Sequence, residues 1–272
     1  MPESKPTPTN PDQSYLDVVL AALRVCLNYK PSCGQGRTGG VTLQEFQRIY
    51  REDEFYAWFG LDSPLVYAAH KAAGGMTSIY RQIGIGCQSL FHRILQDTLG
   101  LSPKDAAWSY NVPTTKSKSR TLSLDGRIPL ESIAGSTRRT AIEAWLKEAS
   151  AGVGLKGKNA ASLRGAVFEV RQGYKSNDAK RQNADVSNAS SAYAYRYLPV
   201  MLLLSVQIPA NLAERYARAR WLILRGTGLG STVDSTYVFC RDVLGYDLAG
   251  FFRRNSAAIR AETLAVFEGL LQ

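Results

Sequence analysis

The sequence predicts an α/β fold in which many helices flank a small mixed sheet. Two short segments, 166–171 and 200–208, are apolar on both faces, which is typical of strands in the interior of a sheet. Over most of the remaining chain, apolar residues recur at helical spacing. No repeat period is present, so we expect a single domain over 14–272 with a helical N-terminal part.

Residues 1–13 contain four prolines and few apolar side chains, so we expect a flexible arm. Helical spacing then predicts helices over 15–27, 42–50, 63–71, 78–102, 138–149, 212–224 and 251–271, and another helix follows residue 185. We expect Gly74 and Gly75 to separate the third helix from the fourth. The aromatic residues of 55–59 are expected in the core.

Two further segments are predicted as strands or turns. In 120–130, Leu122 and Leu124 alternate with polar residues, which predicts a half-buried strand that ends near Asp125. Asp125 can be a carboxylate of a functional site or the first residue of an Asp-Gly turn. The segment 236–240 is either a strand or the start of a helix.

The net charge of +10, from 33 basic and 23 acidic residues, favours a polyanionic partner such as nucleic acid or an anionic membrane surface. No apolar run approaches the roughly 20 residues of a membrane span, and the first residues lack the apolar core of a signal peptide. We therefore expect a cytoplasmic protein with no membrane segment. The four cysteines lack CxxC spacing, so reduced thiols are expected rather than a zinc site.

The strand 166–171 contains two charged residues, Glu169 and Arg171, in an otherwise apolar run. Alternate side chains of a strand share a face, so these two project from the same side, about 6.6 Å apart at ~3.3 Å per residue. Unpaired buried charge costs several kcal/mol. The two side chains therefore either satisfy each other or face a polyanion. Beside the apolar stripe of 78–102, Gln88 and His92 are expected in an interior polar network, with direct roles in a functional site as the alternative.

Asp125 and Glu169 together suggest chemistry on phosphodiesters. They are 44 positions apart, enough for a helix and a return strand, so neighbouring strands can bring them together. Mg²⁺ prefers carboxylate oxygens and water, and it activates water for hydrolysis. Arg171, or Lys175 just after the strand, could orient the attacking water or stabilise the transition state. The alternative is an ordinary ion pair, because many strands carry E-x-[KR].

The segment that follows the strand is almost entirely polar. Asn and Gln pair with adenine, Arg and Lys with guanine, and Asp can accept from cytosine. The segment supplies all of these types: Lys175, Asn177, Asp178, Lys180, Arg181, Gln182 and Asn183. We expect it to read bases in a DNA groove, with a polar surface loop as the alternative.

A strand followed by basic, acidic and basic residues and then by Gln-Asn-Ala resembles type II restriction endonucleases of the PD-(D/E)XK fold, especially the group that cuts sites containing CCGG. The resemblance implies that Asp125 and Glu169 bind metal. It departs at Arg171, which stands where the pattern has lysine. Arginine is a poor base because it cannot be deprotonated. Lys175 is then the alternative source of an ammonium group, and Asp185 is an alternative second acid.

The resulting expectation is a Mg²⁺-dependent endonuclease that hydrolyses both strands of DNA at a palindrome containing CCGG. A palindromic target requires two active sites related by a two-fold axis, so a homodimer is implied at least on DNA. Two alternatives remain. One is a non-catalytic protein that binds DNA or RNA through the same basic surface, and the other is a structural protein whose charge only keeps it soluble.

Overall fold

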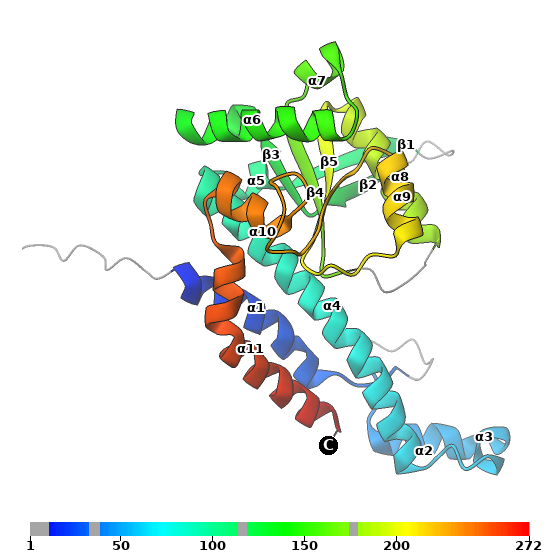
Figure 1. Ribbon diagram of the computed structural model, residues 1–272. Coiled ribbons are helices and arrows are strands. Elements are labelled where there is room, and N and C mark those ends of the chain that lie inside the picture. The colour runs from blue at the N-terminus through cyan, green and yellow to red at the C-terminus, as the bar shows by residue number, and fades with distance from the viewer. Residues whose placement is uncertain (1–10, 33–38, 114–118, 174–178, 272) are drawn as a thin grey trace, which may run out of the picture. The chain divides into compact units, whose positions relative to one another are not determined.

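The computed structural model describes residues 11–32, 39–113, 119–173 and 179–271 (Figure 1). The chain divides into two compact units, one formed by 87–253 and the other by 1–86 together with 254–272. Helices and small sheets are both present, which confirms the α/β class. That the chain is one functional domain over 14–272 stays a prediction.

The unit 87–253 is built on a mixed four-stranded sheet in the order β3-β4-β5-β6. Its strands are β3 (Gly126–Pro129), β4 (Gly165–Arg171), β5 (Tyr197–Leu203) and β6 (Leu222–Leu224). β3 runs antiparallel to β4, whereas β5 and β6 continue parallel to it. Every residue of β4 and β5 is buried, so the prediction of two interior strands is confirmed. The second strand runs over 197–203 and not over the predicted 200–208, since the chain leaves the sheet after Leu203 and Val206 is 61% exposed.

One face of this sheet packs on α8 (Ala179–Ala194) and α9 (Ala210–Arg218), the helices that connect the parallel strands (Figure 1). Val167 of β4 lies in that core with residues of both helices and with Trp108 of β1 (Trp108–Pro113). β1 pairs only with β2 (Ser119–Leu124) in a separate antiparallel ladder.

The opposite face of the sheet carries Phe168. Its ring lies 5.1 Å from that of Phe91 and 5.8 Å from that of Phe239, and it stacks on Trp145 of α6 (Ser136–Gly152) at 6.4 Å. Phe239 belongs to a helical segment, α10 (Thr236–Val238) followed by η3 (Phe239–Leu244), so the helical alternative for 236–240 is the one observed. The short elements α5 (Pro103–Ala106), η2 (Leu130–Ser132) and α7 (Gly157–Ala161) complete this unit.

The predicted helix over 212–224 is wrong in its second half. α9 ends at Arg218, Arg220 adopts a left-handed backbone with φ of 59°, and β6 begins at Leu222. The apolar residues of this stretch fit both a helical stripe and a buried edge strand. Pairing with β5 decides between them.

The other unit is helical, as predicted for the N-terminal part. It contains α1 (Pro11–Arg24), η1 (Val25–Asn28), α2 (Leu43–Glu52), α3 (Glu54–Trp58), most of α4 (Pro64–Leu99) and most of α11 (Leu248–Leu271). α1 begins three residues before the predicted start of the domain, whereas 1–10 lie outside the described residues. Thr42 and Glu45 form a capping box at the start of α2.

α4 is one continuous helix of 36 residues, so the predicted break at Gly74 and Gly75 is wrong. A Cβ at Gly74 would lie 1.8 Å from the Tyr29 hydroxyl, and one at Gly75 would lie 2.8 Å from a methyl group of Leu270. These glycines therefore let neighbouring side chains approach the helix closely instead of ending it.

The aromatic residues of 55–59 are not in the core, which corrects the prediction. Phe55, Trp58 and Phe59 are 58%, 77% and 68% exposed. α3 is a short helix that contacts α2 through Tyr56, whose ring lies 5.0 Å from that of Tyr50. Its other aromatic rings therefore remain at the surface.

The described cysteines Cys26, Cys87 and Cys240 are buried and unbridged, in keeping with the expected thiols, and Cys33 lies outside the described residues. Over the described ranges, none of the helices has the length and apolar character needed to cross a bilayer.

Two glycines of α4 differ in their surroundings, because Gly74 lies against another side chain and Gly84 does not, and this difference allows a matched test of close packing. Gly74→Ala should lower the free energy of unfolding by about 1–3 kcal/mol, because its methyl group would overlap Tyr29. Gly84→Ala, where no atom lies within 4 Å of the added Cβ, should raise it by about 0.5–1 kcal/mol through helix propensity. Urea denaturation measures both changes, and equal shifts for the two variants would contradict this account.

Candidate functional site

The C-terminal end of β4 places two charged side chains on the face of the sheet that α8 and α9 cover. Glu169 and Arg171 have the same parity as Val167, which packs against those helices. They are only 8% and 9% exposed, yet both are ionisable. The predicted shared face is confirmed by an ion pair between Arg171 Nη2 and Glu169 Oε1.

Asp185 of α8 is the second acidic residue in contact with Arg171. Its Oδ1 lies 3.4 Å from Arg171 Nη2. Its Oδ2 accepts a hydrogen bond of 2.5 Å from the Tyr216 hydroxyl, and its backbone oxygen accepts one of 3.2 Å from Trp221 Nε1. Asp185 is 3% exposed, so these contacts hold a buried carboxyl at a defined position.

Asp125 is held beside Glu169 through the backbone of β4. It lies between β2 and β3, directly before Gly126, which is paired with Phe168. Its backbone N–H donates to the Phe168 oxygen at 2.8 Å, and its Oδ2 accepts from the Val170 N–H at 2.8 Å. The carboxylate of Asp125 thus takes the place of a backbone acceptor in the β3–β4 ladder. The predicted proximity of Asp125 to Glu169 is observed.

The Asp-Gly hairpin turn considered for Asp125 is not formed. The strands on either side of it pair with different partners, β2 with β1 and β3 with β4. Gln88 of α4 lies against the same strand end, where its Nε2 donates to the Val170 oxygen at 3.3 Å. The interior polar role predicted for Gln88 is confirmed.

Three carboxyl groups lie around one guanidinium in this cluster, and burial makes the ionisation of two of them, Glu169 and Asp125, unfavourable. Burial raises the pKa of Glu169 to about 8. The charge of Arg171 acts to lower this pKa, whereas Asp125 and Asp185 act to raise it. Burial also raises the pKa of Asp125, while the Val170 N–H and Arg171 act in the opposite direction. An added cation would favour the ionised forms of both acids.

The donor set fits a hard divalent cation that keeps most of its own water. Asp125 and Glu169 offer carboxylate oxygens, and Mg²⁺ commonly uses one or two carboxylates with waters and phosphate oxygens. Among the residues that the structure describes, no group of three His, Cys, Asp or Glu side chains is arranged to hold a metal. Any ion here would therefore be bound mainly by water and by its substrate.

The predicted base-reading residues divide into three groups. Lys175, Asn177 and Asp178 lie outside the described residues. The backbone positions of Lys180 and Arg181 belong to the first turn of α8, and their side chains are outside the described set. Gln182 and Asn183 follow on the same helix, and their side-chain amide oxygens accept hydrogen bonds from Arg215 of α9.

Three residues of this site were not identified by the sequence pattern: Arg215, Tyr216 and Trp221. The sequence shows Arg215 only as part of a basic helical face, and nothing in it distinguishes the Tyr216 hydroxyl from others. Asp185 was only an alternative acid, and the structure brings it to Arg171. Arg215, Tyr216 and Trp221 all contact α8, because α9 and the segment after it pack on the same face of the sheet as α8.

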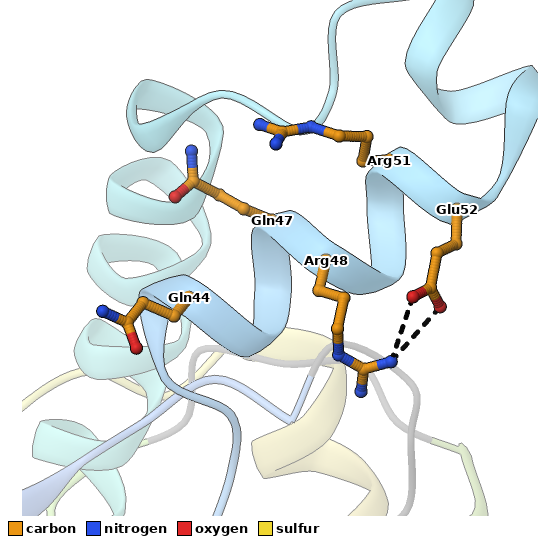
Figure 2. A pocket seen from close by; sticks show the side chains of 5 residues that line it. All are labelled: Gln44, Gln47, Arg48, Arg51 and Glu52. Atoms are coloured by element: carbon orange, nitrogen blue, oxygen red, sulfur yellow. Dashed lines mark hydrogen bonds and ion pairs between the residues drawn. The ribbon is translucent and has the colours of Figure 1, made fainter.

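A second polar surface lies on α2, and its residue types differ from those of the site at the end of β4. A pocket there is lined by Gln44, Gln47, Arg48, Arg51 and Glu52 (Figure 2). Figure 2 shows that all five side chains come from this one helix, with Arg48 paired to Glu52 at 3.2 Å. It has a single carboxylate, already paired, so it lacks the acid pair that phosphodiester chemistry needs.

Comparison of the chain with protein-family models, with curated proteins and with solved structures found no match.

The raised pKa of Glu169 predicts how stability depends on pH. Between pH 5 and pH 8, in EDTA, the folded chain holds a proton at Glu169 that the unfolded chain has released, so the free energy of unfolding should fall as pH rises. Glu169→Gln should lower this slope by about 1 kcal/mol per pH unit. Glu131→Gln, which alters an exposed partner of Arg164, should keep the parent slope. Parallel urea-derived curves for Glu169→Gln and the parent would contradict the prediction.

The Tyr216 hydroxyl should contribute measurably to stability. Tyr216→Phe removes a donor from the buried Asp185 carboxyl and should cost about 1–3 kcal/mol in urea denaturation. Tyr195→Phe, at a position 49% exposed, should change the free energy of unfolding by less than about 0.5 kcal/mol. A cost at Tyr216 no larger than at Tyr195 would show that the hydrogen bond does not hold Asp185.

Proposed function

We propose that this chain is a divalent-metal-dependent endonuclease that cuts double-stranded DNA at a specific sequence, in the manner of type II restriction enzymes with a PD-(D/E)XK core. One observation carries the proposal. Asp125, Glu169 and Arg171 lie together at the end of a central strand, and the chain continues from that strand directly into the base-reading segment. A catalytic acid pair and a recognition element are thus adjacent.

The residues divide the chemistry between them. Asp125 and Glu169 would hold the cation through their carboxylate oxygens. A bound Mg²⁺ would neutralise phosphate charge and lower the pKa of a water nucleophile. Arg171 remains protonated, so it serves as a fixed positive charge for the transition state and not as a base. Asp185, whose Oδ1 lies 3.4 Å from Arg171 Nη2, would remain a partner of the guanidinium if Glu169 bound a cation.

The partners follow from the proposed reaction. A net charge of +10 suits binding to a phosphate backbone, and a palindromic target would be cut by two copies related by a two-fold axis. A CCGG core for the target, Lys175 as a second cation at the site, and a cytoplasmic location remain predictions.

A non-catalytic DNA-binding protein is the second candidate, and one observation favours it. Arg171 stands where a catalytic lysine is expected, and its guanidinium is engaged by Glu169 and Asp185. A site of this kind could hold the strand end rigidly without hydrolysing anything. The two candidates differ in whether removal of the acids abolishes an activity.

Digestion of plasmid DNA with Mg²⁺ or Mn²⁺, followed by sequencing of the fragment ends, tests the proposal. We expect discrete cuts with two-fold symmetric ends. Asp125→Asn and Glu169→Gln should lower the cleavage rate by at least ~100-fold and leave DNA binding within about 3-fold, since neither alters the recognition segment. Asp97→Asn, at an exposed carboxylate paired with Arg93, is the matched control and should cleave normally. Sequence-specific binding without any cuts would favour the non-catalytic candidate, and full cleavage by Asp125→Asn would place the site elsewhere.

A further inference from the structure

One guanidinium on α9 holds the two amide side chains at the start of α8. Arg215 Nη1 donates to Gln182 Oε1 at 2.7 Å, and Nη2 donates to Asn183 Oδ1. Gln182 is half-buried and Asn183 is exposed, so the pair lies at the surface of the unit 87–253. Gln182 and Asn183 are adjacent in sequence, and a single arginine engages both.

The chemistry of arginine fixes which atom of each amide faces it. A guanidinium carries only donors, so the atoms that meet Arg215 must be the carbonyl oxygens. The two NH₂ groups consequently point away from Arg215. Each amide thereby keeps its donors for a partner other than Arg215 and shares its acceptor with a permanent positive charge.

The next residue of α9, Tyr216, also binds α8. Tyr216 is fully buried and donates to Asp185, which lies one helical turn beyond Gln182 on α8. Arg215 and Tyr216 therefore bind consecutive parts of α8 at the same time. Such double attachment leaves Arg215 little freedom to withdraw from the amides.

This orientation changes which base the amides should prefer. Asn and Gln usually read adenine with both an acceptor and a donor, because the adenine edge offers N6–H₂ and N7 in the major groove. The guanine edge offers only acceptors, O6 and N7. We propose that Arg215 converts Gln182 and Asn183 into a paired donor site that binds the major-groove edge of guanine. This inference rests on the proposed sequence-specific DNA binding.

Selection of bound sequences from a random DNA library, with Ca²⁺ in place of Mg²⁺, tests the inference. The parent should select a motif with guanine at one or more positions. At those positions Arg215→Ala, which frees both oxygens, should reduce the preference for guanine over adenine by ~10-fold or more. Arg218→Ala is the matched control, because this exposed arginine of the same helix pairs with Glu214, and it should select the parent motif.

A second variant keeps the test independent of any loss of folding in Arg215→Ala. Gln182→Glu retains an oxygen for Arg215 but removes the NH₂ donor, so it should lose the guanine preference at one position. An unchanged guanine-to-adenine ratio in both variants would overturn the role of Arg215 while leaving the proposed function intact. If the parent selects no motif at all, the proposed sequence-specific binding fails, and the inference fails with it.

Discussion

The buried guanidinium of Arg171 is the interaction on which the site depends. It lies among carboxyl groups from β4 and α8, on a face of the sheet that two helices cover. Removal of one partner from a buried ion pair costs about 3–5 kcal/mol, because the remaining charge has no water to stabilise it. The positions of the strand end and of α8 are therefore linked through one side chain.

Asp125 shows how closely fold and proposed chemistry are connected here. Its side chain supplies an acceptor to the β4 backbone, so it contributes to the sheet as well as to the acid pair. One carboxylate oxygen is used in this way. This fixes the spacing of the acid pair by backbone geometry instead of by flexible side chains, as a preorganised site requires.

The proposed recognition residues and the acid cluster are linked through the same two helices, α8 and α9. Arg215 and Tyr216 are neighbours on α9, and they contact the amides and the acid of α8 respectively. A displacement of α8 by bound DNA would thus act on Asp185 and, through it, on Arg171. Both side chains of α9 lie 30 or more residues away from their partners in sequence, so only the packed fold makes this link.

The sequence by itself determined that β4 and β5 are buried strands, that Glu169 and Arg171 share a face, and that Asp125 can reach them. These follow from continuous apolar runs, from the two-residue period of a strand and from chain length. It did not determine that Gly74 and Gly75 lie inside a helix, that α9 stops at Arg218, or that the aromatic rings of α3 are exposed, because each depends on what packs against the segment. The same holds for the site. That Asp185 contacts Arg171, and that the amide oxygens of Gln182 and Asn183 face Arg215, are decided by tertiary contacts of α8 that local sequence does not specify.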